Sequence, residues 1–423
     1  MDVWTENGLP GYTQGRPETP FLGLAPFLRM NINGADLVPL REAMLEALTR
    51  VERSFNDTNL WMNLSLLMQC LGQRDLGLSI QARALALNRV YHLAASKQPA
   101  KLRLLILKAP GDLAANVPLE CLFENSEIDL DFYYVSHGTP FPVPIPDHDI
   151  LMVGIGESDE NRILLALLEE PLARWAKPVI NAPQDIPTTE RTAASRLLRN
   201  VSGILISPTV RATRTAMLAI ANGNKHISEF FEGYDYPVIL RPVGSHAGRN
   251  LEKIISSEEI TTYLSSVDAE EFFLSPFIDY SGKNGLFRKI RLAMIGGLPF
   301  ACHLAVSSHW MIHYVNAGMY EDVWKRAEEA SFMAHFDDFV QRHQPALKAI
   351  YCLTKLDYLC VDCAETQEGQ LLVFEIDPAM LVHAMDHEHL FPYKQPQMRK
   401  VRNAFQDLLL RLVANHPTAN LRW

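Results

Sequence analysis

The sequence contains no run of about 18 apolar residues, the length that a membrane-spanning helix requires, so we expect no transmembrane segment. The first residues, MDVWTENGLPGYTQGRPETP, lack the basic and apolar regions of a secretory signal. Positive charge is also scarce, because 39 Lys and Arg residues stand against 49 Asp and Glu residues and leave a net charge of −10. Nucleic-acid-binding proteins cluster their cations, and this balance argues against that class. These absences predict a cytoplasmic protein that binds neither nucleic acid nor membranes.

Cysteine is rare as well, with six residues in 423. Only Cys360 and Cys363 have the spacing of a redox or metal-binding pair. The surrounding apolar run predicts a strand, in which side chains three positions apart point to opposite faces. No second pair has the spacing that would complete a zinc site. We therefore interpret both as buried, reduced thiols.

The N-terminal part reads as an arm followed by helices. Residues 1–30 are rich in Pro and Gly and predict an extended arm. Apolar residues then recur at helical spacing from Leu37 to Ser96, and residues 60–87 have the helix–turn–helix outline of a single tetratricopeptide repeat. One such pair cannot stack into a solenoid, so it should pack on the rest of the chain. It is either a docking or homodimerisation surface or, as we favour, a helical cap.

From Lys101 onward, short apolar runs alternate with helical segments. Strands are expected over 102–108, 130–135, 150–154 and 178–181, with helices over 117–123 and 161–177. This alternation is typical of a small parallel sheet in an α/β protein. Gly154 and Gly156 follow a strand as in a dinucleotide-binding turn, but the third glycine is missing and acidic residues follow. The dinucleotide interpretation is therefore weak.

Residues 236–254 combine a strand with a glycine-bearing loop. Ile239 and Arg241 should share one face of the strand, and Gly244 and Gly248 allow the loop backbone to approach phosphate oxygens closely. The Gly-Lys-Ser/Thr of a Walker A loop is absent. A cation facing such a loop suits a polyphosphate.

Residues 371–378 carry a second chemical signal. Glu375 and Asp377 should project from one face of a strand, with Phe374 and Ile376 packed behind them. Asp362 lies within another apolar strand, where a charge is costly unless it is paired or binds a cation. Three such carboxylates form a hard oxygen site suited to magnesium. The alternative is a solvated strand end followed by an Asp-Pro turn.

Taken together, the segments 241–248, 272–279, 288–297, 356–363 and 375–377 resemble the ATP-grasp superfamily, in the branch of glutathione synthetase and the ribosomal-protein-modifying glutamate ligases. The resemblance spans roughly residues 100 to 395. It implies an α/β (α+β) multidomain fold with an N-terminal arm and helical segment over 1–99, a small parallel α/β pre-grasp domain over 100–205, and an ATP-grasp domain over 206–423.

The resemblance also implies a reaction and its residues. ATP and two Mg²⁺ ions, for which Mn²⁺ could substitute, would drive ligation of a small-molecule carboxylate to an amine or thiol through an acyl-phosphate. The metal ligands would be Asp362, Glu375 and Asp377. The implied nucleotide-binding residues are Arg191, Arg241, Gly244, Ser245, His246, Gly248, Ser275, Phe277 and Asp279. The implied catalytic residues are Arg291, Arg241, Lys289, His303 and His309.

Some positions depart from the family pattern. Arginine replaces the usual lysine at 191 and 241, and Lys289 occupies a position that is often acidic. Histidines replace arginines on the acceptor side, where His309 and His313 would have metal-ligand spacing in a helix. His303 and His309 could also donate hydrogen bonds to an acyl-phosphate, act as acid and base, or have a structural role. A second histidine cluster, residues 383–389, is interpreted as a substrate contact or, less favoured, a zinc site.

Three functions stay open from the sequence. The favoured one is a carboxylate–amine (or thiol) ligase. The alternatives are a small-molecule kinase on the same fold, and a nucleotide-binding interaction protein that uses its helical segment as a platform.

Overall fold

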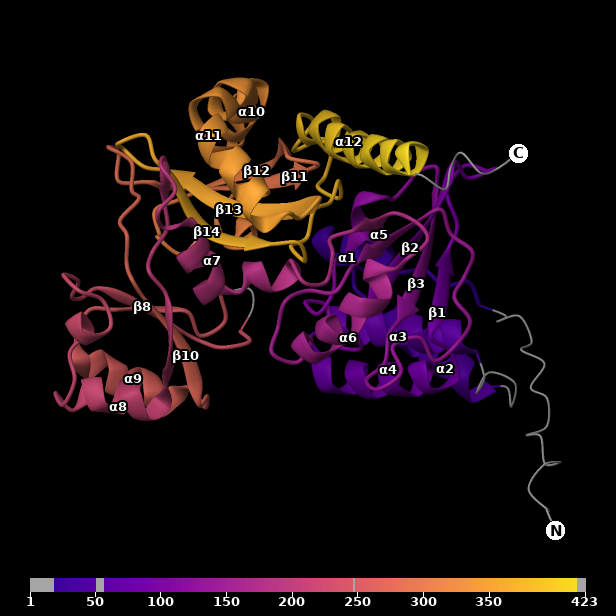
Figure 1. Ribbon diagram of the computed structural model, residues 1–423, viewed down its shortest axis with the longest axis horizontal. Coiled ribbons are helices and arrows are strands. Elements are labelled where there is room, and N and C mark those ends of the chain that lie inside the picture. The colour runs from indigo at the N-terminus through magenta and orange to yellow at the C-terminus, as the bar shows by residue number, and fades with distance from the viewer. Residues whose placement is uncertain (1–18, 51–56, 246–247, 417–423) are drawn as a thin grey trace, which may run out of the picture.

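The computed structural model describes residues 19–50, 57–245 and 248–416, and helices and strands intermix along this chain (Figure 1). The predicted α/β multidomain class is confirmed. In the described ranges, no helix has both the length and the apolar character needed to cross a bilayer. The helices are α1 (Ala25–Ile32), α2 (Val38–Arg50), α3 (Thr58–Cys70), α4 (Arg74–Leu87), α5 (Leu119–Leu122), α6 (Arg162–Ala173), α7 (Arg191–Leu198), α8 (Arg214–Ala221), α9 (Ser257–Ser266), α10 (Val323–Ala334), α11 (Phe336–Thr354) and α12 (Lys394–Asn415).

The N-terminal segment differs in part from the prediction. Residues 1–18 of the expected arm lie outside the described residues, and residues 25–30 are not extended but belong to α1. Pro26 occupies the first turn of that helix, where its missing N–H costs nothing. The helix–turn–helix prediction is confirmed by α3 and α4, and the Asp57 side chain caps α3 by accepting a hydrogen bond from the Leu60 amide at 3.1 Å.

The first sheet has the strand order β1-β3-β2-β4-β5. The pairs β3–β2, β2–β4 and β4–β5 are parallel, as predicted. The strand β1 adds an antiparallel edge within residues that were expected to be helical, so the helical prediction is wrong there. The two faces of this sheet pack in different hydrophobic cores. Leu104 on one face packs with α3, and Leu105 on the other face packs with α6. The strands are β1 (Val90–Leu93), β2 (Leu102–Lys108), β3 (Ile128–Tyr134), β4 (Ile150–Val153) and β5 (Val179–Ile180).

The second sheet has the order β7-β10-β8-β9 and is antiparallel. Val238, Leu240 and Phe272 pack against α8 and α9 in one buried cluster. Side chains alternate along a strand, so Ile239 and Arg241 project from the opposite face, as the sequence predicted. The strands are β7 (Val210–Thr213), β8 (Val238–Pro242), β9 (Glu252–Ile254) and β10 (Glu271–Pro276).

The third sheet has the order β12-β11-β13-β14-β6. Leu292, Val361 and other residues on one face pack with α11, and α12 covers part of the other face around Ala293. Cys360 and Cys363 lie in β13, fully buried and free, which confirms their interpretation as buried thiols. The strands are β6 (Ile204–Leu205), β11 (Phe287–Ile295), β12 (Leu298–Ser307), β13 (Tyr358–Glu365) and β14 (Leu371–Asp377).

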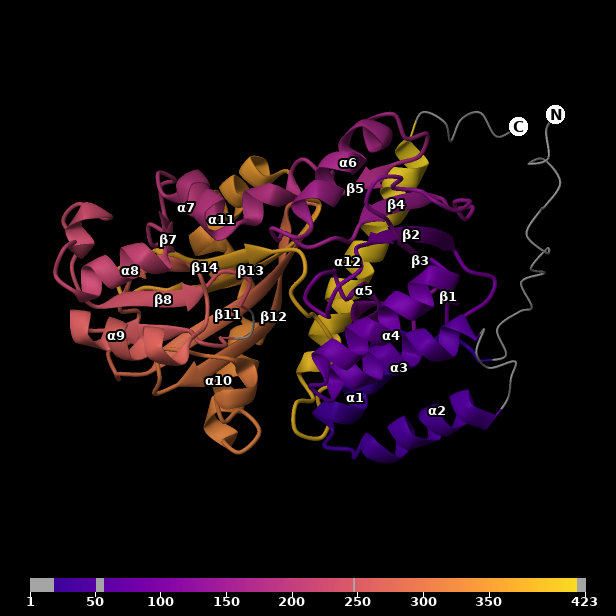
Figure 2. The same cartoon turned by 90° about the horizontal axis from the view of Figure 1, so that it is seen from below.

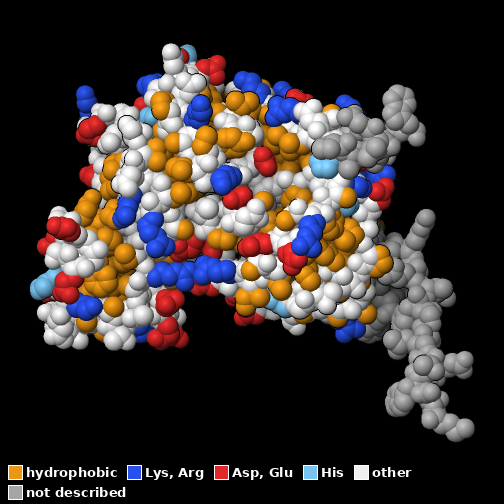
Figure 3. Space-filling model, in the orientation of Figure 1, with side chains coloured by type: hydrophobic (Ala, Val, Ile, Leu, Met, Phe, Trp, Pro, Cys, Tyr) orange, Lys and Arg blue, Asp and Glu red, His pale blue; other side chains and the backbone are white. Residues whose placement is uncertain are grey.

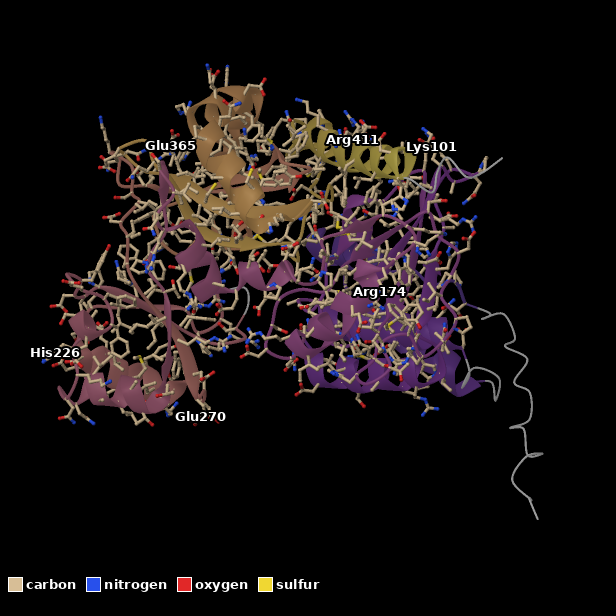
Figure 4. The ribbon with its side chains drawn as sticks, viewed as in Figure 1. Lys101, Arg174, His226, Glu270, Glu365 and Arg411 are labelled. Carbon is tan, nitrogen blue, oxygen red and sulfur yellow. The ribbon has the colours of Figure 1, made fainter. Side chains whose placement is uncertain are left out.

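These parts form two lobes joined in the middle of the molecule (Figure 1). The second sheet with α8 and α9 forms one end, and the first sheet with α1 to α6 forms the other. Helix α12 runs from the third sheet across to the first sheet, as the view in Figure 2 also shows. His226 and Glu270 lie on the lobe of the second sheet, opposite Lys101 at the far end (Figure 4). The third sheet is therefore placed to form a site with both lobes.

Candidate functional site

A cavity of about 570 Å³ lies where the second and third sheets face each other, and residues of α1 and of the loop before α5 also line it. This volume falls within the range of small-molecule binding sites. The space-filling view shows a hollow at the lower edge between the two lobes, with Lys, Arg, Asp and Glu side chains along its rim (Figure 3).

Arg191, Arg241, Lys289 and Arg291 bring positive charge into the cavity from three elements, α7, β8 and β11. Arg241 is only 9% exposed, and it donates to the carbonyl and hydroxyl oxygens of Ser245, which carry no charge. Burial and the neighbouring Arg191 lower the pKa of Arg241 to about 9. Two arginines held together in this way favour an anion between them.

Asp362, Glu375 and Asp377 line the same cavity. The Arg291 guanidinium donates to both Asp362 oxygens at 2.7 and 2.9 Å, and Lys289 Nζ lies 2.7 Å from Oδ2. Burial opposes ionisation of Asp362, but these two cations hold its pKa well below the usual range. Asp362 is therefore a buried carboxylate neutralised by two cations of the protein itself.

Glu375 and Asp377 have opposite electrostatic surroundings. Glu375 pairs with Arg191. Burial favours the protonated form of Glu375, but the charges of Arg191 and Arg241 outweigh burial and lower its pKa. Burial and the negative charge of Glu375 raise the pKa of Asp377 to about 7. Asp377 also accepts a hydrogen bond from the Ala379 amide at 2.7 Å. A cation placed between these two carboxylates would relieve their repulsion.

The sheet register explains why the charged residues meet. Across β12, β11, β13 and β14, cross-strand partners follow one another in the order His303, Arg291, Asp362, Glu375. Cross-strand partners share one face of a sheet, so the charged groups of Arg291, Asp362 and Glu375 project to the same side. Residues some 70 positions apart in the sequence thereby become neighbours.

A β-bulge in β14 changes the predicted environment of Phe374. Asp362 is opposite Glu375 while Cys363 is opposite Val373, so Phe374 is the extra residue. The sequence prediction that Phe374 packs behind the strand is wrong: it lines the cavity and lies 4.8 Å from the Tyr280 ring. Glu375 and Asp377 face the cavity as predicted, while Ile376 packs in the core.

The end of the cavity around Phe374 is apolar and aromatic. Ile239, Phe277 and Leu372 line it with Phe374, and Ser275 adds a hydroxyl group. Phe277 stacks edge-on with Trp310 at 5.7 Å, and Lys253 lies 4.5 Å from the Phe277 ring centre. Flat apolar surfaces of this kind suit a heteroaromatic base.

The cavity gathers most of the predicted site residues, but not all of them. Arg191, Gly248, Ser275 and Phe277 of the predicted nucleotide set line it with Arg241. Gly244 lies instead in a small depression beside the α3–α4 turn, and Ser245 contacts Arg241 from outside the lining. His246 lies outside the described residues. The Asp279 carboxylate does not line the cavity and accepts from the Ser281 amide at 2.9 Å.

The two histidines proposed as catalytic do not line the cavity. His303 packs on the Tyr314 ring at 4.9 Å, and burial together with Arg291 lowers its pKa well below the usual range. His309 is exposed. His313 does line the cavity, but residues 308–313 are not helical, so the helical metal-ligand spacing of His309 and His313 does not exist.

The cluster over 383–389 is not a metal centre in this arrangement either. His383 accepts a hydrogen bond from the Met385 amide at 3.1 Å, and the His387 and His389 rings are 5.1 Å apart. Within the described ranges, no group of three or more His, Cys, Asp or Glu side chains is arranged to hold a metal ion.

Magnesium nevertheless fits part of the carboxylate set. Glu375 and Asp377 offer hard oxygen donors, and the raised pKa of Asp377 reflects a negative charge that a divalent cation would offset. Asp362 already has two cationic partners. The residues present therefore fit an ion at Glu375 and Asp377 better than a set of ions shared by all three carboxylates.

Sequence reasoning missed several lining residues. Ser207 and Thr209 lie between α7 and β7, and Met311 follows β12, in segments where the sequence assigned no site role to these residues. Leu24 and Leu28 of α1 are 160 or more positions from the charged residues, and no local pattern reveals that they line the same cavity.

Comparisons with known proteins find only distant likenesses. No family model matches the chain, and no curated protein matches it. Among solved structures, a D-alanine–D-alanine ligase from Coxiella burnetii is similar with 13% identity and a TM-score of 0.47, covering 76% of this chain and 98% of that one. A RimK-domain ATP-grasp protein from Sphaerobacter thermophilus has 15% identity and a TM-score of 0.41, covering 73% and 99%. D-alanyl-alanine synthetase A from Vibrio cholerae has 12% identity and a TM-score of 0.46, covering 75% and 98%. With TM-scores below 0.5, the residues of the cavity themselves must carry any functional assignment.

Proposed function

We propose that this protein is an ATP-dependent ligase of the ATP-grasp kind that activates a carboxylate as an acyl-phosphate and joins it to an amine or thiol. The observation that carries the proposal is the cavity's charge: four cations and three carboxylates line one space beside an aromatic end, in a chain of net charge −10. Such a charge arrangement suits a nucleoside triphosphate and a second anion.

In this proposal the base lies against Phe277 and Phe374, and the phosphates lie between Arg191 and Arg241. Gly248 lines the same cavity, and the position requires glycine because it has φ +67° and a Cβ atom there would lie 2.3 Å from His313 Nε2. Arg291 and Lys289, fixed by Asp362, offset the charge that builds on the transferred phosphoryl group.

The chemistry then has two balanced steps. A substrate carboxylate oxygen bonds to the γ-phosphorus as the bond to ADP breaks, which gives an acyl-phosphate. The amine nitrogen or thiol sulfur then bonds to the acyl carbon, phosphate leaves, and the nucleophile loses its proton. Glu375 and Asp377 would hold a magnesium ion, which would supply positive charge to offset that of the phosphates.

A kinase on the same fold is the second candidate, because the phosphate-binding residues would be the same for an alcohol substrate. The lining contains Ser, Thr and His side chains but, among the described residues, no Asp or Glu beyond the three carboxylates. Asp362 and Glu375 are paired with arginines, and Asp377 would hold magnesium in this proposal, so none of the three is assigned to take a proton from an alcohol. This favours a carboxylate, which needs no base.

The first test is nucleotide binding. Isothermal titration of the full chain with ADP and Mg²⁺ should give micromolar affinity, and Glu375→Ala should weaken it at least tenfold. Glu368→Ala, at an exposed position in the β13–β14 turn, is the matched control and should bind as the wild type does. Absence of binding by the wild type would refute the proposal.

The second test separates ligase from kinase. With ATP, Mg²⁺ and pooled carboxylic acids, hydroxylamine should trap the acyl-phosphate as a hydroxamate, detected by mass spectrometry with stoichiometric ADP. A stable product that is heavier by one phosphoryl group, without any hydroxamate, would establish the kinase instead.

A further inference from the structure

One end of the cavity is apolar and belongs to neither the phosphate nor the base region. Among the residues that the structure describes, its lining carries no ionisable side chain and comes from three separate parts of the chain: the start of α1, the loop before α5, and the segment after β14. The residues are Leu24, Leu28, Leu113, Ala114, Met380 and Leu381.

This apolar end begins directly beside the reacting groups. Arg291 Nη1 donates to the Leu381 carbonyl at 3.1 Å while the rest of its guanidinium holds Asp362. The Leu381 side chain in turn packs in one cluster with Leu24, Leu28 and Leu113. A molecule whose charged group contacts Arg291 would thus reach the leucines with its next few atoms.

The apolar end is also built rigidly. Lys108 Nζ lies 3.2 Å from Glu120 Oε1, with both side chains buried, and this pair fixes α5 beneath the loop that carries Leu113. A Cβ atom at Gly156 would lie 3.1 Å from the Ala379 side chain and 3.3 Å from the Ala114 carbonyl oxygen, which is too close for ordinary contact. The absence of a side chain at 156 lets the segment after β14 pack against that loop.

On the basis of the proposed function, we propose that this end binds the apolar body of the carboxylate substrate, so that the enzyme activates carboxylic acids bearing an aliphatic or aromatic group. The carboxylate lies at Arg291, and the hydrocarbon extends between α1 and Leu381. Each buried methylene should tighten binding about fourfold, the equivalent of ~0.8 kcal/mol. A second carboxylate at the far end would be buried without a cation and is rejected.

The test measures hydroxamate formation by the full chain with ATP, Mg²⁺ and hydroxylamine, using acetate, butanoate, hexanoate and octanoate beside succinate, adipate and suberate. We expect kcat/KM to rise about fourfold per methylene until the cavity is filled, and each dicarboxylate to be at least 100-fold poorer than the monocarboxylate of equal length. Equal rates for all monocarboxylates, or a preference for dicarboxylates, would overturn this inference and leave the ligase proposal standing. No hydroxamate from any acid, with no nucleotide binding, would overturn both.

A variant locates the pocket. Leu28→Trp should shorten the accessible space, so that KM for octanoate rises at least tenfold relative to KM for acetate. Leu218→Trp, at a 42% exposed position on α8 away from the cavity, is the control and should keep the wild-type chain-length profile. An unchanged profile in Leu28→Trp, with its fold verified by circular dichroism, would place the acid elsewhere.

Discussion

At the scale of single residues, the cavity depends on charges that the protein pairs before any ligand is bound. Arg291 presents its planar guanidinium to Asp362 through two hydrogen bonds, while a third donor is directed to the Leu381 carbonyl. These three hydrogen bonds fix the orientation of the guanidinium group. In the proposed reaction, the cation is thereby held in advance where negative charge would develop on the transferred phosphoryl group.

We predict that Arg291→Lys keeps the charge but loses this geometry, since lysine cannot form the paired hydrogen bonds. Hydroxamate formation should fall about 100-fold, the cost of removing one preorganised donor, while ADP affinity changes by less than about threefold. Arg288→Lys is the control, because Arg288 is on the same strand but pairs with Glu328 outside the cavity. Equal losses in the two variants would show that Arg291 acts only through the stability of the sheet.

Glu365 illustrates a residue that stabilises the fold away from the site. Hydrogen bonding from His343 and the charge of Arg342 lower the pKa of Glu365 to about 2, despite opposition from partial burial. An acid whose pKa is lower in the folded state than its ordinary value of 4.5 stabilises the fold above that value, and this stabilisation is lost as pH falls toward 2.

We therefore expect Glu365→Gln to lower the free energy of unfolding by about 1 kcal/mol at pH 7, after allowance for solvent screening of a partly exposed pair. The difference from wild type should shrink between pH 5 and pH 3. Urea unfolding at both pH values measures this difference in the free energy of unfolding, with Glu368→Gln as the control. A difference that stays constant with pH would contradict the assigned role of the charge.

At the scale of elements, the bulge in β14 adds Phe374 to the cavity without moving the carboxylates away from it. We predict that Phe374→Ala weakens ADP binding about tenfold, because stacking on a base contributes roughly 1–3 kcal/mol. Binding of inorganic tripolyphosphate, which has no base, should not change. Calorimetry with both ligands tests this, and Phe336→Ala on α11 is the control for loss of an aromatic ring elsewhere.

The bulge also shows what could and could not be predicted from the sequence. Strand periodicity correctly placed Ile239 beside Arg241 and Glu375 beside Asp377, because period two is a local property. It placed Phe374 wrongly, since a bulge depends on how the strand pairs with its neighbour β13, which period two does not reveal. The roles assigned to these residues stay predictions.

The histidines and leucines give a similar lesson. His303 and His309 have residue types suited to catalysis, yet neither reaches the cavity, whereas Leu24 and Leu28 do. Residue chemistry alone favoured the histidines, and the helix formed by residues 25–32 was expected to be an extended arm. Which side chains share a cavity is decided by tertiary packing between segments that lie far apart in the sequence.

At the scale of the whole molecule, a buried polar network joins α12 to α10 and to the segment after β14. Lys394 Nζ lies 3.0 Å from Asp386 and 3.6 Å from Glu329, which is fully buried. The hydroxyl groups of Tyr314 and Tyr393 both donate to Glu329 at 2.7 Å. A single cation thus serves two buried carboxylates.

We expect Lys394→Met to lower the free energy of unfolding by about 3–5 kcal/mol, because it leaves buried carboxylates without a cation. Lys400→Met, at an exposed position on the same helix, should change it by less than about 0.5 kcal/mol. Chemical denaturation measures both. Similar values for the two variants would mean that the network is not a significant source of stability.

The path of α12 has a consequence for the order in which the chain folds during synthesis. Phe405 packs on Phe123 at 5.4 Å and stacks on Tyr358 at 4.9 Å, so the core that begins with Phe21 is completed only by Leu409. Proteins usually fold from the N-terminal side as they emerge from the ribosome. Here the lobe of the first sheet lacks α12, one of the helices that cover it, until nearly the whole chain has been made. Ribosome-bound chains halted at residue 390 should therefore be cleaved by protease within the first sheet much faster than the released full-length chain. Equal resistance would show that the first lobe closes without its last helix.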